Sequence, residues 1–160
     1  MFFTVRLADP SSDLLTRHVD LLRAAVRRTQ ADHLFDIDAW VTLPDHLHCI
    51  WKLPPGDSDH AARWAVIMAR FTRALGQDPK HAKPIWHPHI WQHAIRGPQE
   101  HKHLTRYCWM NPVKHGLVPQ PGDWLYSSWH RDRLDVIAEE CGVAVKPGAG
   151  ASQARDLVVA

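Results

Sequence analysis

Two histidines, His46 and His48, stand two positions apart inside an apolar, strand-like stretch of this 160-residue chain, TLPDHLHCIWKL. Side chains two positions apart in a strand point to the same side, with Cα atoms about 7 Å apart. Both imidazoles could therefore reach one metal ion. Two ligands do not complete a metal site, and a histidine pair of this kind is more often a surface feature of a strand. The chemistry depends on whether the chain supplies a third ligand.

A second segment, about sixty residues later, combines a tyrosine with a hard metal ligand: HLTRYCWMNPVKHGLV. Tyr107 and Asn111 are four positions apart, so they share one face of a helix if the helix extends that far. The amide oxygen of asparagine suits Mg²⁺ or Mn²⁺. A tyrosine hydroxyl has an unperturbed pKa of about 10 and needs a nearby cation to act as a nucleophile at neutral pH.

Together, these four residues suit the cleavage of a phosphodiester bond. A metal ion held by His46, His48 and Asn111 would polarise a non-bridging phosphate oxygen and orient the scissile bond. Tyr107 would attack phosphorus and displace the 3′ oxygen. The resulting 5′-phosphotyrosine link retains the bond energy for rejoining, so the residues predict DNA nicking and strand transfer.

The surrounding sequence predicts the elements that position these residues. Alternating β-forming residues predict four strands, at residues 2–7, 35–43, 46–53 and 90–96. Apolar residues at helical spacing predict three helices, at residues 12–32, 60–75 and 99 to about 110. The order β-α-β-β-α-β-α predicts an α+β domain with an antiparallel sheet and helices on one face. Asn111-Pro112 is expected to weaken or close the last helix, because a residue before proline avoids the helical region.

The loop between the second and third predicted strands decides which way the histidines face. Residues 35–43 alternate strictly, so the odd-numbered apolar side chains are expected on one face. A two-residue turn would pair Leu43 with His46, whereas a three-residue loop pairs Leu43 with Leu47. We expect the longer loop, because it keeps the apolar faces of the two strands together. His46 and His48 would then lie on the open face of the sheet.

Three segments together resemble the HUH single-strand DNA transposases that carry one catalytic tyrosine, and more narrowly the REP-associated tyrosine transposases. LPDHLHCIW is similar to the histidine–hydrophobe–histidine strand of that family, YCWMNPVKHGLV to its tyrosine helix, and DWLYSSWH to the Trp-Ser-Ser segment that follows. The similarity runs from about residue 3 to residue 131. The histidine pair alone is weak evidence, whereas three segments in this order and spacing are specific.

The resemblance implies a ferredoxin-like fold, a divalent metal ion (Mg²⁺ or Mn²⁺), and single-stranded, hairpin-forming DNA as the substrate. By position, it implies His46 and His48 as metal ligands, Asn111 as the third ligand and Tyr107 as the nucleophile. Residues 1–131 would form the transposase domain, and residues 132–160 a C-terminal extension that is partly mobile. The chain begins inside the first strand of the family pattern, so we expect that strand to be short or to start upstream.

Basic and aromatic side chains near the proposed site could contact DNA. Arg96, Arg106 and Lys114 are candidates for phosphate contacts, which would weaken with added salt. WHPHIW stands where relatives often carry basic residues, so weaker contacts are expected there. Five tryptophans could stack unpaired bases, although most are expected to pack in the core: Trp86, Trp91, Trp109, Trp124 and Trp129.

Composition sets broad limits on the protein. A formal net charge of +2 and 45% apolar residues suit a single globular domain and permit a nucleic-acid partner without requiring one. The three cysteines are widely spaced and form no CxxC pair, which indicates a reducing compartment. No apolar run is long enough to cross a membrane. We expect a cytoplasmic protein that acts as a monomer or a homodimer.

Two other functions stay open on the sequence. A non-catalytic protein that retained the fold would bind DNA hairpins without metal-dependent cleavage. A small structural protein could instead hold zinc through clustered histidines such as His87 and His89. Against zinc, Pro88 separates that pair and structural zinc normally requires four ligands.

Overall fold

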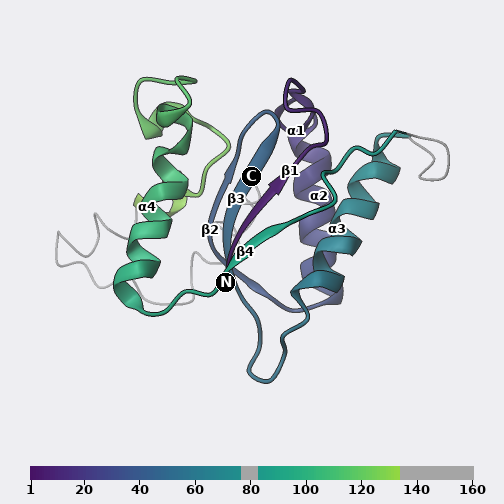
Figure 1. The fold of residues 1–160 in the computed structure, drawn as a ribbon, viewed down its shortest axis with the longest axis horizontal. Helices are drawn as coiled ribbons and strands as arrows, with labels where there is room; N and C mark the ends of the chain where they lie inside the picture. Colours follow the sequence, from purple (N-terminus) through teal and green to yellow (C-terminus); the bar gives the residue numbers. More distant parts are fainter. Residues whose placement is uncertain (77–82, 134–160) are drawn as a thin grey trace.

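A four-stranded antiparallel sheet forms the centre of the structure, a computed structural model that describes residues 1–76 and 83–133 (Figure 1). Its strands, in the spatial order β2-β3-β1-β4, are β1 (Phe2–Arg6), β2 (Asp36–Thr42), β3 (His46–Lys52) and β4 (Trp91–His93). The helices are α1 (Leu14–Arg17), α2 (Val19–Asp32), α3 (His60–Ala74), α4 (Pro98–Lys114) and the short 3₁₀ helix η1 (Pro121–Asp123). The α+β class, the element order and the ferredoxin-like strand order agree with the prediction, with the first predicted helix divided at His18.

Helices lie on both faces of the sheet. α2 and α3 pack side by side on one face, as predicted, whereas α4 lies on the opposite face (Figure 1). The expectation that all helices share one face is therefore corrected for α4. The physical reason is that the second face also carries buried apolar residues, which Cys108 and Leu104 of α4 cover: Phe2, Ala39, Val41, Leu43 and Ile50.

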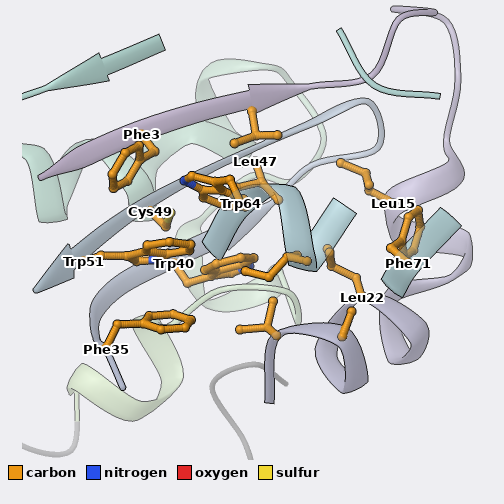
Figure 2. Packing of buried hydrophobic residues seen from close by; sticks show 14 of the residues in the cluster. Phe3, Leu15, Leu22, Phe35, Trp40, Leu47, Cys49, Trp51, Trp64 and Phe71 are labelled. Carbon is orange, nitrogen blue, oxygen red and sulfur yellow. The ribbon is translucent and has the colours of Figure 1, made fainter. Parts of the chain in front are cut away.

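The larger core fills the space between the sheet and the α2–α3 pair. Trp51 of β3 and Trp64 of α3 stack with ring centroids 4.3 Å apart and planes 16° apart. Phe3 and Phe35 extend this aromatic cluster on either side (Figure 2). Both tryptophans are almost completely buried, so each removes a large apolar surface from water on folding.

The β2–β3 connection has two residues, and the predicted three-residue loop is wrong. The backbone N–H of Leu43 donates to the carbonyl of His46 at 2.8 Å, which leaves Pro44 and Asp45 as the connection. Val41 then pairs with His48. The histidines therefore share a face with Val41 and Leu43, and this face is covered by α4 instead of open to solvent.

A β-bulge in β2 explains why the predicted register was wrong. Ile37 pairs with Trp51 and Ala39 with Ile50, which leaves Asp38 as an extra residue in the ladder. The bulge reverses the alternation, so Ile37 packs toward α2 and α3 while Ala39 faces α4. The expectation that all odd-numbered residues of 35–43 share one face is thus corrected, because the two-residue period holds only in an unbroken ladder.

α4 continues through Pro112 to Lys114 instead of ending near residue 110. Proline removes one backbone donor from the helix. The following turn keeps its own hydrogen bonds, because the N–H groups of His115 and Leu117 donate to the carbonyls of Asn111 and Pro112. Since Pro112 is also buried, packing stabilises the extra turn and keeps Tyr107, Asn111 and Lys114 on one helix.

The segment after α4 returns to the sheet and covers the free edge of β2. The N–H of Thr42 donates to the carbonyl of Tyr126, and the N–H of Ser128 donates to the carbonyl of Trp40, both at 2.8 Å. Ser127 forms an isolated antiparallel bridge with Val41. The Ser-Ser pair of the Trp-Ser-Ser segment thus satisfies backbone groups at a sheet edge.

Two further expectations from the sequence concern the C-terminal extension and membrane-spanning segments. Of the predicted C-terminal extension, residues 134–160 lie outside the described residues. Within residues 1–76 and 83–133, no helix combines the length and the apolar character that crossing a membrane requires.

The Trp64→Ala variant should lower the free energy of unfolding by about 3–5 kcal/mol, because it removes a buried indole and leaves a cavity. Urea unfolding followed by circular dichroism measures this loss. Leu34→Ala is the control, because the Leu34 side chain is 71% exposed and its truncation should change stability by less than about 0.5 kcal/mol. Equal effects of the two variants would contradict the assigned core.

Candidate metal and nucleophile site

The four residues singled out in the sequence come together between β3 and α4. His46 and His48 project from β3 toward α4, with ring centroids 5.0 Å apart. The ring of Tyr107 lies 5.2 Å from that of His48 at an angle of 71°. Asn111, one turn further along α4, is 1% exposed and also faces the sheet. Residues more than fifty positions apart in the chain thus form one cluster.

One ring nitrogen of each histidine, Nδ1, takes part in a hydrogen bond. Nδ1 of His46 donates to the carboxylate of Asp45 at 2.7 Å, and Nδ1 of His48 is hydrogen-bonded to the hydroxyl of Thr4 at 2.8 Å. Such contacts fix the orientation of metal-binding histidines and leave Nε2 to coordinate. Thr4 lies opposite His48 in the β1–β3 ladder, so the sheet register itself positions this partner.

His48 is held in its neutral form. Burial lowers the pKa of His48 to about 3, and electrostatic interactions with three neighbours lower it further: His46, Arg6 and His115. The nearby amide of Asn111 opposes the shift only weakly. Neutral imidazole is the form that binds metal ions, so His48 is ready to act as a ligand throughout the neutral pH range.

Asn111 carries an unpaired polar group in the protein interior. Among the described residues, neither the oxygen nor the nitrogen of its amide has a hydrogen-bond partner. A buried amide without a partner is unfavourable by about 1–3 kcal/mol and calls for an explanation. An amide oxygen beside two oriented histidines fits a divalent cation that accepts mixed nitrogen and oxygen ligands.

The described part of the chain contains no group of three or more His, Cys, Asp or Glu residues that could hold a metal ion. The amide of Asn111 is thus the candidate for a third ligand beside the histidine pair. His87 and His89, named for the zinc alternative, are exposed with ring centroids 5.8 Å apart, and Nδ1 of His87 is close to the backbone of His89. Nothing in their geometry favours a structural zinc site.

Tyr107 lies between an aromatic side chain and a cation. Its ring meets that of Phe2 edge-on at 6.0 Å, and Nζ of Lys114 stands 5.3 Å from its ring centroid. Lys114, predicted as a DNA contact, is therefore beside the tyrosine. Arg96 and Arg106, the other two predicted contacts, are exposed, and the structure does not test their binding to phosphate.

The sequence analysis missed one histidine of the cluster. His115 follows α4 directly, and its ring centroid lies 5.1 Å from that of His46. It stands four positions after Asn111, a spacing that would have placed it on the same helical face if the helix had been expected to continue past Pro112. Thr4 was missed as well, because its role depends on the pairing of β1 with β3.

Two known proteins with related descriptions are similar in sequence to this chain. No protein-family model matches the chain. The chain is 47% identical over 131 residues to the REP-associated tyrosine transposase of Escherichia coli, which covers 82% of this chain and 76% of the relative. A protein of similar description from Haemophilus influenzae is 34% identical over 151 residues, 88% of this chain and 86% of the relative.

A solved structure is also similar to this chain. It is that of a REP-associated tyrosine transposase bound to a REP hairpin, and it matches with a TM-score of 0.78 and 47% sequence identity. The match covers 83% of this chain and 78% of the other. The two chains therefore share the fold and nearly half of the residues in the matched region.

The Asn111→Leu variant should be more stable than the parent in the absence of divalent ions, by about 1–2 kcal/mol, because it removes a buried amide without a partner and keeps the volume. Thermal and urea unfolding in EDTA measure the difference. Asn111→Ala is the matched control: it removes the same amide but leaves a cavity, so it should gain less or lose stability. A Leu variant less stable than the parent would show that the amide is satisfied.

Proposed function

The chain belongs to the family of REP-associated tyrosine transposases, and from that membership we propose that it cuts and rejoins single-stranded, hairpin-forming DNA through Tyr107. The main support is the contact between Tyr107 and His48 beside the unpaired amide of Asn111. The hairpin bound to the related solved structure supports the class of DNA.

In the proposed reaction, the hydroxyl oxygen of Tyr107 attacks a backbone phosphorus. The new bond joins this oxygen to phosphorus, and the bond from phosphorus to the 3′ oxygen of the preceding nucleotide breaks. The phenolic proton leaves to solvent, and the departing 3′ oxygen takes up a proton. Rejoining is the reverse attack by a 3′ hydroxyl, so a covalent intermediate conserves the phosphodiester without an external energy source.

Three residues would hold the divalent metal ion: His46, His48 and Asn111. When bound, such an ion supplies positive charge to the phosphate and orients the scissile bond. The fixed ring orientations support this assignment, since Asp45 and Thr4 hold both Nδ1 atoms.

Two cations of the chain would help to bring the phosphate to Tyr107. Lys114 lies over the tyrosine ring, and Arg6 is exposed at the end of β1, in the row of the ladder that contains His46. Both lie on the side of the sheet that α4 covers. Such contacts bind the DNA backbone regardless of its sequence and weaken as salt is added.

Tyr107→Phe should abolish the covalent protein–DNA adduct, because phenylalanine lacks the attacking oxygen. The assay incubates labelled hairpins from the DNA flanking this gene with Mn²⁺ and separates the products on a denaturing gel. A 3′ label should remain with the protein and a 5′ label should leave on a shorter strand, since the tyrosine retains the 5′ phosphate.

Tyr126→Phe is the matched control, because Tyr126 is the second of the two tyrosines in the chain. Its ring packs against Trp124 at 5.3 Å and has the guanidinium of Arg23, from α2, over it at 5.8 Å. This variant should form the adduct as the parent does. An adduct in Tyr107→Phe would refute the proposed nucleophile, and hairpin binding with no adduct in the parent would leave a non-catalytic DNA-binding protein.

Mn²⁺ should raise the melting temperature of the parent by several degrees, because at about 100 times its dissociation constant a ligand adds about 2.7 kcal/mol. His48→Ala and Asn111→Leu should lose most of this shift. His33→Ala, an exposed histidine after α2, should retain it. If Mn²⁺ raised the melting temperature of all four proteins equally, the metal ion would bind at a different site.

A further inference from the structure

An open cavity of about 680 Å³ adjoins Tyr107 on the side of the sheet that α4 covers. Its lining comes from four parts of the chain: β1, β3, α4 and the segment that leads into β4 together with the start of that strand. Tyr107 and His48 belong to this lining, as does Trp91. The volume lies in the range of pockets that bind small organic ligands, and the cavity is continuous with the candidate active site.

The sheet register places Trp91 in line with His48. Thr4 of β1 pairs with His48 of β3 on one side and with Trp91 of β4 on the other. Cross-strand partners project from the same face of a sheet, so His48, Thr4 and Trp91 form one row. His48 and Trp91, at the two ends of this row, are separated by two inter-strand spacings, a distance of about 10 Å.

Trp91 is unusually exposed for a tryptophan in this chain. All eight tryptophans lie within the described residues, and Trp91 is the exposed one, at 56%. The edge of its ring system meets Phe2 at 5.7 Å, and His93 lies parallel to it at 5.9 Å and 8°. The indole is therefore held in place while more than half of it remains open to a ligand.

The charge of the cavity favours an anionic occupant. None of its lining residues is acidic, and Arg6 contributes a permanent positive charge. Three histidines add polar ring nitrogens to the lining: His87, His89 and His103. An aromatic platform next to basic side chains is the arrangement by which proteins bind single-stranded nucleic acid. A second copy of this chain would be a poorer match, since it would have to present acidic groups to this surface.

We propose that the cavity binds one unpaired nucleotide next to the phosphodiester that Tyr107 attacks, with its base stacked on Trp91 and its phosphate near Arg6. This inference rests on the proposed function of Tyr107 and adds a subsite to it. A base can reach Trp91 only if it has left its pairing partner. The subsite therefore makes cleavage selective for single-stranded positions beside a hairpin, without reading which base is present.

The test measures binding separately from cleavage. Fluorescently labelled hairpins with a single-stranded flank, taken from the DNA beside this gene, are titrated with protein in EDTA and followed by anisotropy. Trp91→Ala should weaken binding by about 5- to 150-fold, the range for loss of one stacked base. Trp91→Phe should retain most of the affinity, and Leu125→Ala, whose side chain is 69% exposed outside the cavity lining, should not change it.

Abasic substitution identifies the stacked nucleotide. Each flanking nucleotide is replaced in turn by an abasic one, and binding to the parent and to Trp91→Ala is compared. At one position, the substitution should weaken binding to the parent and have no further effect on Trp91→Ala, because both changes remove the same contact. Additive effects at every position would overturn the proposal.

The remaining outcomes separate this inference from the proposed function. Unchanged affinity of Trp91→Ala, with a Tyr107 adduct still formed in Mn²⁺, would overturn the subsite and keep the nucleophile. If one abasic position weakened binding to the parent but not to Trp91→Ala, and the parent formed no adduct, the nucleotide subsite would stand and the catalytic role of Tyr107 would be overturned. Unchanged affinity with altered sedimentation would assign Trp91 to a contact between copies and also overturn the subsite.

Discussion

The packing of α4 against the histidine-bearing face of β3 is the constraint on which the site depends. Cys108 is completely buried in this interface together with Val41 and Ile50. Tyr107 and Asn111 flank Cys108 on the same helix, so the apolar contacts that hold α4 to the sheet also bring these two polar residues to His48. A helix packed by side-chain interdigitation has little freedom to shift, which gives the cluster a fixed geometry.

A second set of contacts fixes the far side of α4. The hydroxyl of Ser128 accepts from the backbone N–H of Trp40 and from the indole N–H of Trp109, and it donates to Asp132. One buried hydroxyl thus links β2, α4 and the segment that follows α4. The same segment needs a glycine, because a Cβ at Gly122 would come within 2.9 Å of the Trp129 ring. The Trp-Ser-Ser segment therefore supports the site indirectly, by holding the helix and the sheet edge together.

The site retains groups that do not favour folding. His48 must remain neutral in the interior, and the amide of Asn111 is buried without a partner among the described residues. Trp91 likewise leaves apolar surface in water. Such departures from good packing and pairing are expected where a surface is kept for a ligand. All three lie along one face of the sheet, whereas the opposite core, around Trp51 and Trp64, is apolar and closely packed.

The sequence by itself determined the element types and their order, and it singled out His46, His48, Tyr107 and Asn111, because periodicity and residue spacing are local properties. The tertiary structure decided which side those residues face. One extra residue at Asp38 reversed the alternation of β2, and a two-residue connection set the register of β3. Both depend on pairing with distant strands and on apolar surface that α4 must cover, so no local pattern could reveal them. The unpaired amide of Asn111 and the row from His48 to Trp91 follow from the same non-local contacts.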